Sequence, residues 1–202
     1  MLPLGAPLSI TGSTVLNDSV SSAQTWVFGY GSIIWNPGFT FEEKCTASYI
    51  GWQRRFWQGS HDHRGTPAAP GRVVTLVPAP EHRCRGMAFR LADADAPEIL
   101  AQLDYREKNG YERILAPLWL DDGRRCNGIT YIASADNPAY LGDANADAIA
   151  QQIASSTGPS GRNRDYLFEL ATAFRELAID DPHVFDLEQR VRALTDKPDG
   201  SE

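Results

Sequence analysis

A loop with two glycines around a tyrosine is the first segment that could bind a ligand. Phe28-Gly29-Tyr30-Gly31-Ser32 continues a short apolar run, 26–30, of the kind that forms a buried strand. Glycines let a backbone approach a ligand closely, and successive N–H groups in such a turn can form an anion-binding concavity. A purely structural turn is the alternative. The nucleotide signature G-x-G-x-x-G is not met, because Ile34 stands at its third glycine.

One acidic residue stands where a general base could be held firmly. Glu107 lies in the charged run Asp104-Tyr105-Arg106-Glu107-Lys108, at the expected end of a short helix that leads into a strand. A carboxylate that is partly withdrawn from water can exchange protons near neutral pH. A solvated helix end is the alternative that spacing alone leaves open.

Other reactive side chains carry weaker patterns. His61 and His63 stand two apart with no third ligand motif, so a polar loop is favoured over a metal site. Cys45, Cys84 and Cys126 are widely spaced and odd in number, which favours reduced thiols in a cytoplasmic protein. The serine-hydrolase motif G-x-S-x-G is absent. We expect no metal site.

The elements that must position these residues begin with strands. In the second of them, Ile50, Trp52 and Phe56 fall on one face, which Arg54 interrupts. Apolar and alternating runs predict roughly six strands, at 26–30, 47–58, 72–77, 85–91, 111–120 and 127–133.

One short helix is expected to interrupt the strands. Asp95 can cap it, Pro97 falls in its first turn, and Ile99 and Leu103 face the core. Gly110 just beyond its end is a natural stop. This helix and the strand after it would fix the position of the acid between them.

The second part of the chain is predicted to be helical. Apolar residues recur at helical spacing after residue 140, and Asp181-Pro182 gives an N-cap followed by proline at the first helical position. Strands first and helices afterwards predict an α+β fold in a single domain, residues 25–195. Residues 1–24 are expected to be a tail, mobile or used for targeting, and 196–202 a frayed end.

Charge and hydropathy exclude several classes of protein. The 202 residues include 19 Lys and Arg against 26 Asp and Glu, for a net charge of −7. A negative balance argues against nucleic acid and anionic membranes as partners, and no apolar run is long enough for a membrane span. Nothing in the pattern predicts an oligomeric state.

Taken together, seven segments resemble the ChaC family of glutathione-degrading γ-glutamyl cyclotransferases. The resemblance covers about residues 26–194, with Ile33 and Asn109 as mild departures where the family usually has Leu and Gly. The matching segments are Trp26-Val-Phe-Gly-Tyr-Gly-Ser-Ile-Ile-Trp-Asn-Pro-Gly-Phe39, Arg54-Arg-Phe-Trp-Gln-Gly-Ser-x-Asp-His-Arg-Gly65, Pro70-Gly-Arg-Val-Val-Thr-Leu76, Tyr105-Arg-Glu-Lys-Asn-Gly-Tyr111, Asp136-Asn-Pro-x-Tyr-Leu-Gly142, Ser156-x-Gly-Pro-Ser-Gly-Arg-Asn163 and Tyr166-Leu-Phe168.

The resemblance implies a fold, a reaction and a set of site residues. The fold would be the γ-glutamyl cyclotransferase-like one, a small mixed β-barrel flanked by helices. Glutathione would be cleaved to 5-oxoproline and cysteinylglycine by attack of its own α-amine, without cofactor, water or metal. Glu107 would be the proton acceptor, and the loop Phe28 to Ile33 would bind the γ-glutamyl group. Arg54 or Arg72 could hold a substrate carboxylate or form an internal ion pair, and Tyr166 could lend a hydroxyl.

Two other functions stay open at this point. One is a cyclotransferase that acts on other γ-glutamyl compounds, such as γ-glutamyl amino acids or amines. The other is a non-enzymatic regulator of a cation transporter, which would need an exposed apolar docking face and would have no need of Glu107.

Overall fold

Five strands form a closed barrel in the computed structural model, which describes residues 24–108 and 110–196. Their order around the barrel is β1-β3-β2-β4-β5, and β1 closes it by pairing parallel with β5, whereas the other pairs are antiparallel. The strands are β1 (Trp26–Gly29), β2 (Glu43–Ser60), β3 (Gly71–Arg90), β4 (Glu112–Leu120) and β5 (Arg125–Ile132).

The barrel therefore has one strand fewer than the sequence predicts. The two strands expected at 72–77 and 85–91 are a single long strand, β3, which continues through Pro78 and Pro80. The pairing of β3 with β2 shifts register at this point, next to Gly51 with a φ of +85°. Prolines cannot donate to a strand ladder, but they are tolerated at bulges. The segment between the two expected strands is therefore a bend within one continuous strand.

The expectation that Ile50 and Phe56 share one face of β2 is wrong, because this bulge lies between them. Ile50 lies before the bulge and is 41% exposed, whereas Phe56 lies beyond it and is fully buried. A bulge adds a residue to one strand, so the alternation of faces does not run through it unchanged. Arg54, which interrupts the apolar row in sequence, is 2% exposed and belongs to the interior.

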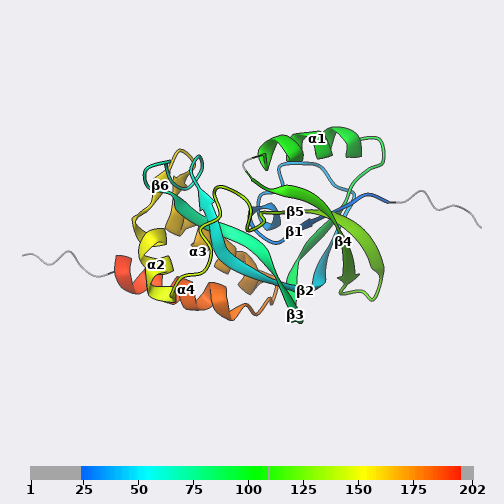
Figure 1. Ribbon diagram of the computed structural model, residues 1–202. Helices are drawn as coiled ribbons and strands as arrows, with labels where there is room; N and C mark the ends of the chain where they lie inside the picture. Colours follow the sequence, from blue (N-terminus) through cyan, green and yellow to red (C-terminus); the bar gives the residue numbers. More distant parts are fainter. Residues whose placement is uncertain (1–23, 109, 197–202) are drawn as a thin grey trace, which may run out of the picture.

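Helices flank the barrel on two sides, as the strands-then-helices order predicts (Figure 1). The long β2–β3 ribbon extends away from the barrel to the group formed by α2, α3 and α4, while α1 lies against the barrel itself. The fold is α+β. The remaining elements are η1 (Ser32–Ile34), α1 (Ala96–Arg106), α2 (Ala146–Ser155), β6 (Thr157–Gly158), β7 (Gly161–Arg162), α3 (Asn163–Glu176) and α4 (Pro182–Thr195). None of the described helices is both long and apolar enough to cross a membrane.

The ends of α1 and α4 agree with the sequence in part. Asp181 caps α4 by accepting a hydrogen bond from the backbone N–H of Val184, as expected. Asp95 takes the N-cap position of α1, but its side chain makes no capping hydrogen bond. Gly110 has a φ of +99°, a conformation that suits glycine just after a helix. The expected tail up to residue 23, the end beyond 196, and Asn109 lie outside the described residues.

The position of α1 is fixed by its apolar face. Ile99 and Leu103 are buried against Val27, Phe89 and other residues on the outer side of β1, β3 and β5. Burying a large aliphatic side chain stabilises the fold by about 1.5–3 kcal/mol. The C-terminal end of α1 is thereby held next to the loop that follows β1.

Candidate active site

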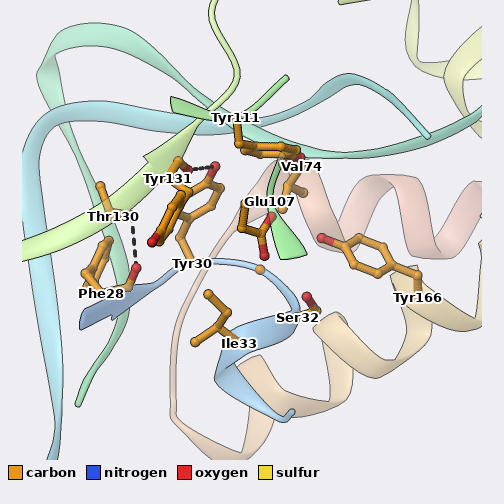
Figure 2. Close-up of a pocket in the computed structure, with 11 residues that line it drawn as sticks. Phe28, Tyr30, Ser32, Ile33, Val74, Glu107, Tyr111, Thr130, Tyr131 and Tyr166 are labelled. Atoms are coloured by element: carbon orange, nitrogen blue, oxygen red, sulfur yellow. Dashed lines mark hydrogen bonds between the residues drawn. The ribbon is translucent and has the colours of Figure 1, made fainter. Parts of the chain in front are cut away.

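Glu107 is the C-cap residue of α1, and its side chain points into a small cavity at the mouth of the barrel (Figure 2). Its side chain is 18% exposed, so the expectation of a solvated helix end does not hold. The cavity has a volume of about 50 Å³, enough for a few water-sized groups. It is lined by Phe28, Tyr30, Gly31, Ser32, Ile33, Val74, Glu107, Tyr111, Thr130, Tyr131 and Tyr166.

The surroundings of Glu107 make it a stronger base than an ordinary surface carboxylate. Burial raises the pKa of Glu107, while the nearby Arg106 and His63 act in the opposite direction and Asp62 adds to the rise. The Nε of Arg106 lies 3.3 Å from a carboxylate oxygen of Glu107. A buried carboxylate with a raised pKa is suited to accept a proton near neutral pH.

The loop after β1 faces this carboxylate. Gly31 is the N-cap of the 3-10 helix η1, so the first N–H groups of Ser32 and Ile33 have no partner within that helix. A Cβ atom on Gly31 would lie 2.9 Å from the hydroxyl of Tyr166 and 2.9 Å from a methyl of Val74. Glycine at this position therefore leaves the space between the loop and Tyr166 open.

Arg106 joins the helix that carries Glu107 to this loop. One Nη donates to the hydroxyl of Ser32 at 2.9 Å, and the other donates to the carbonyls of Asn36 and Pro37 at 3.2 and 3.1 Å. Charged donors form stronger hydrogen bonds than neutral ones. Sequence reasoning did not assign Arg106 a role, although it stands in the same motif as the acid.

Tyrosines close the cavity on its other sides. The hydroxyl of Tyr30 donates to the carbonyl of Tyr131 at 2.6 Å, and that of Tyr111 donates to the carbonyl of Val74 at 2.8 Å. Burial raises the pKa of Tyr30, Tyr111 and Tyr166, so all three stay protonated as neutral walls. Tyr166 is brought to the cavity as predicted, whereas Tyr111 and Tyr131 were not singled out from the sequence.

A wider cleft opens from the cavity toward solvent. Its volume is about 780 Å³, within the usual range for small-molecule sites, and Ser32, Glu107, Tyr111 and Tyr166 line both spaces. The outer walls of the cleft include Trp35, Asn36, Gly38, Ser60, Asp62, His63, Arg64, Arg106, Ser160 and Glu169. The loop at residues 60–64 and the start of α3 thus face Glu107 across the cleft.

The predicted loop residues divide between cavity wall and support. Phe28, Tyr30, Gly31, Ser32 and Ile33 line the cavity. Gly29 does not line it. A Cβ on Gly29 would lie 2.7 Å from the side chain of Ile33, so the glycine allows the loop to fold back on itself.

Arg54 and Arg72 are not brought to the cavity or the cleft. Arg54 is buried, forms an ion pair with Asp181, and donates to the carbonyl of Tyr30 at 2.6 Å. The alternative of an internal ion pair is therefore the arrangement found for Arg54. Its bond to Tyr30 supports the loop from behind.

Arg72 is held by neutral oxygen atoms inside the protein. It is 6% exposed and donates to the side-chain oxygen of Gln152 at 2.6 Å and to the carbonyls of Phe56 and Gly142 at 2.9 and 3.1 Å. These bonds join α2 to the β2–β3 ribbon. Neither of the two buried arginines, Arg54 and Arg72, lines the cleft.

Of the two histidines, His63 lines the cleft and His61 does not. His63 is half-exposed, with Nδ1 3.1 Å from the hydroxyl of Ser160 and Nε2 3.6 Å from Asp62. No group of three or more potential metal ligands occurs among the described residues. Cys84 is buried away from the cavity, and burial raises the pKa of its thiol to about 11.

The chemistry available here is proton transfer between Glu107 and a group bound between it and the loop. The carboxylate can accept a proton from the bound group, and backbone N–H groups of the loop can stabilise negative charge on an oxygen atom. A compact polar group would fill the inner cavity, and the rest of a ligand would extend into the cleft.

Known proteins resemble this chain in sequence. The sequence model of a family described as "ChaC-like protein" matches residues 25–194. "Gamma-glutamylcyclotransferase 2-3" of Arabidopsis thaliana is 44% identical over 177 residues, which cover 84% of this chain and 89% of that protein. "Glutathione-specific gamma-glutamylcyclotransferase" of Schizosaccharomyces pombe is 37% identical, with 85% of this chain and 94% of that protein covered.

A solved structure shares the fold. The crystal structure of a yeast γ-glutamyl cyclotransferase specific to glutathione superposes with a TM-score of 0.80 at 30% identity, and covers 85% of this chain and 96% of that one. Sequence, fold and the matched residue range all agree with the resemblance noted in the motifs. This chain belongs to the ChaC-like family.

Proposed function

We propose that this protein is a glutathione-specific γ-glutamylcyclotransferase, which converts glutathione to 5-oxoproline and cysteinylglycine. The observation that carries the proposal is the buried carboxylate of Glu107 opposite the loop of Tyr30 to Ile33, in a cavity that opens into a substrate-sized cleft. Relatives named for this activity support it. The active unit is proposed to be residues 25–195.

Glu107 is proposed to move a proton twice. An α-amine with a pKa of about 8 is largely protonated at neutral pH and cannot attack a carbonyl. The carboxylate, whose pKa is raised by burial, takes that proton, and the freed amine attacks the γ-carbonyl of the same residue. The carboxylic acid then gives this proton to the leaving nitrogen of cysteinylglycine as the peptide C–N bond breaks. The regained carboxylate takes the second proton from the attacking nitrogen, which becomes the lactam N–H, and this proton leaves with the product amine.

The loop is proposed to hold the γ-glutamyl group and its developing oxyanion. Gly31, Ser32 and Ile33 line the cavity, and their backbone N–H groups are proposed to donate to an anionic oxygen of the substrate. Bringing amine and carbonyl together in one substrate contributes much of the acceleration, because well-aligned intramolecular reactions gain about 7–11 kcal/mol. Tyr166 supplies a wall and a hydroxyl next to Gly31.

The decisive experiment is to incubate the purified protein with glutathione and to follow 5-oxoproline and cysteinylglycine by mass spectrometry. Production of both in equal amounts supports the proposal. Equal turnover of γ-glutamylalanine would move the assignment to a cyclotransferase of broader range. No turnover of any γ-glutamyl compound would favour the regulator of a transporter instead.

The place of action is proposed to be the cytoplasm. Cys45, Cys84 and Cys126 are all free thiols. Free thiols persist in reducing compartments, where glutathione is itself kept reduced.

A further inference from the structure

Arg64 and Arg106 both line the outer cleft, and they differ in how many of their guanidinium donors have partners within the protein. All three guanidinium nitrogens of Arg106 have protein partners, as described above. In Arg64, one Nη donates to the carbonyl of Arg162 at 3.3 Å and the other lies 3.6 Å from Glu169. A guanidinium has five N–H donors. Within the described part of the chain, Arg64 therefore keeps donors that a ligand can use.

Arg64 lies one aromatic side chain away from the inner cavity. Its guanidinium carbon is 5.8 Å from the ring centre of Tyr166, and Tyr166 lines both the cavity and the cleft. The side chain of Arg64 is only 17% exposed. It is therefore a partly desolvated cation, held by the ring, the carbonyl and the carboxylate around it.

The proposed substrate needs a cation in the outer cleft, beyond the cavity that holds its γ-glutamyl group. When the γ-glutamyl group fills the cavity, the cysteine and glycine residues remain outside, and two extended residues span roughly 7 Å. The chain ends in the glycine carboxylate. Asp62 and Glu169, which line the same cleft, would repel that group unless a cation met it.

We infer that Arg64 binds the glycine carboxylate of glutathione and so selects peptides that end in a free carboxylate at this distance. This inference rests on the proposed function and adds a specificity residue to it. A planar guanidinium matches a carboxylate with two parallel hydrogen bonds. Glu169 competes for the same guanidinium, so it weakens substrate binding.

The test compares two substrates that differ only at the glycine carboxyl group. Values of kcat and KM are measured for glutathione and for its glycine monoethyl ester, with wild type, Arg64→Met, Arg64→Lys, Glu169→Gln and the control Arg162→Met. Arg162 is a neighbouring exposed arginine that does not line the cleft, so its loss removes the same charge without the contact. Circular dichroism checks the folding of each variant.

Wild type is expected to prefer glutathione over the ester by about 10- to 100-fold, the range of a charge-assisted hydrogen-bond pair. Arg64→Met should lose that factor on glutathione, mainly through KM, and should change the ester by less than about twofold. Arg64→Lys should fall between the two. Glu169→Gln should lower KM for glutathione alone, and Arg162→Met should behave like wild type.

Two results would overturn the inference while leaving the proposed function intact. One is a wild type that turns over acid and ester equally, and the other is an Arg64→Met variant that loses the same factor on both. Calorimetric titration of both ligands into Glu107→Gln, with and without Arg64→Met, provides a readout that needs no turnover. A wild type that forms no 5-oxoproline would defeat the proposed function, and equal binding in this titration would defeat the role of Arg64.

Discussion

Arg106 donates a hydrogen bond of 2.9 Å to the hydroxyl of Ser32 and thereby ties the helix that presents Glu107 to the loop that faces it. The two residues are 74 positions apart in sequence, so the contact depends on the docking of α1 against the barrel. The same guanidinium lies beside the carboxylate of Glu107. Arg106 therefore acts on both the position and the charge of the proposed base.

Replacing Arg106 should move the pH dependence of the reaction. The cation favours the ionised form of Glu107 and so opposes the rise in its pKa that burial causes. In Arg106→Met the pKa of Glu107 should rise further, and the acidic limb of the pH profile of kcat/KM should shift to higher pH. His63 and Asp62, the other two residues that act on the pKa of Glu107, are present in both proteins. Arg106→Lys keeps the positive charge, so the acidic limb of its pH profile should stay where it is in wild type. An acidic limb that does not move in Arg106→Met would contradict this account.

Arg72 should matter for stability and not for substrate binding. Arg72→Met removes the donors that satisfy Gln152 and the carbonyls of Phe56 and Gly142 inside the protein. Unsatisfied buried groups should lower the free energy of unfolding by about 2–4 kcal/mol, measured by urea denaturation. KM for glutathione should stay within about twofold. A stable variant with a greatly raised KM would restore the role of Arg72 in binding a substrate carboxylate.

His183 should make the protein sensitive to acid. Burial is the main cause that lowers its pKa from 6.5 to about 4, and its Nε2 accepts a hydrogen bond from the backbone N–H of Phe56 at 3.2 Å. The unfolded chain therefore binds this proton more readily than the folded one. The associated stability is present above about pH 6.5 and is lost as the pH falls toward 4, by up to about 3 kcal/mol.

The variant His183→Gln isolates this effect. Glutamine keeps an acceptor for Phe56 but does not titrate, so its Tm should fall less than that of wild type between pH 6.5 and pH 4. Parallel Tm curves for the two proteins over this range would show that another group controls the acid response.

Gly31 should be intolerant of even a methyl group. The Cβ of Gly31→Ala would lie 2.9 Å from the hydroxyl of Tyr166 and from Val74, so the loop or the ring must move. We expect kcat/KM to fall by about tenfold or more, because a misplacement of the order of 1 Å is costly in an aligned site. The double variant Gly31→Ala with Tyr166→Phe removes the contact with the hydroxyl, while the contact with Val74 stays, so it should recover part of the loss; purely additive effects would argue against the contact with Tyr166.

Local sequence marked the loop and the acid as candidates, because each lies within one continuous segment, but only the family resemblance gave them roles. Glu107 is recognisable at a helix end, and the glycines of the loop follow a buried strand. The pairing of Arg106 with Ser32 and the approach of Arg64 to Tyr166 join segments far apart in sequence. No periodic pattern encodes such contacts, so Arg106 and Arg64 were missed although their motifs were recognised.

The expectations that the structure decides or corrects have physical causes of the same kind. For Arg54, a contact with a substrate carboxylate and an internal ion pair were both left open, and an arginine is fully buried only when it is paired. Its burial depends on Asp181, which comes from the N-cap of a helix 127 positions later. The extra strand was expected because prolines usually end strands, and the bulge opposite Pro78 is visible only once β2 and β3 are paired.

The carboxylate of Glu107 is the group on which the proposed mechanism depends, and Glu107→Gln removes its basic oxygen while it keeps its size. The fold should survive, because the charge that is lost is itself partly desolvated and the amide can still bond to Arg106. General acid–base groups contribute about 10²–10⁴-fold, or about 3–5.5 kcal/mol of barrier, and a group used twice should lie near the upper end. Substrate binding should change much less, since the loop from Tyr30 to Ile33 is unaltered.

Two neighbouring acids provide controls for Glu107→Gln. Glu112 is exposed, so Glu112→Gln should leave the rate unchanged. Asp104 accepts a hydrogen bond of 2.7 Å from Tyr131, a residue of the cavity wall, and pairs with Arg113, so Asp104→Asn should cost at most a few-fold. Steady-state kinetics with circular dichroism decide the matter. If Glu107→Gln keeps more than about a tenth of the wild-type kcat, a single carboxylate does not carry the proton, and the second group must be sought among the residues of the cleft.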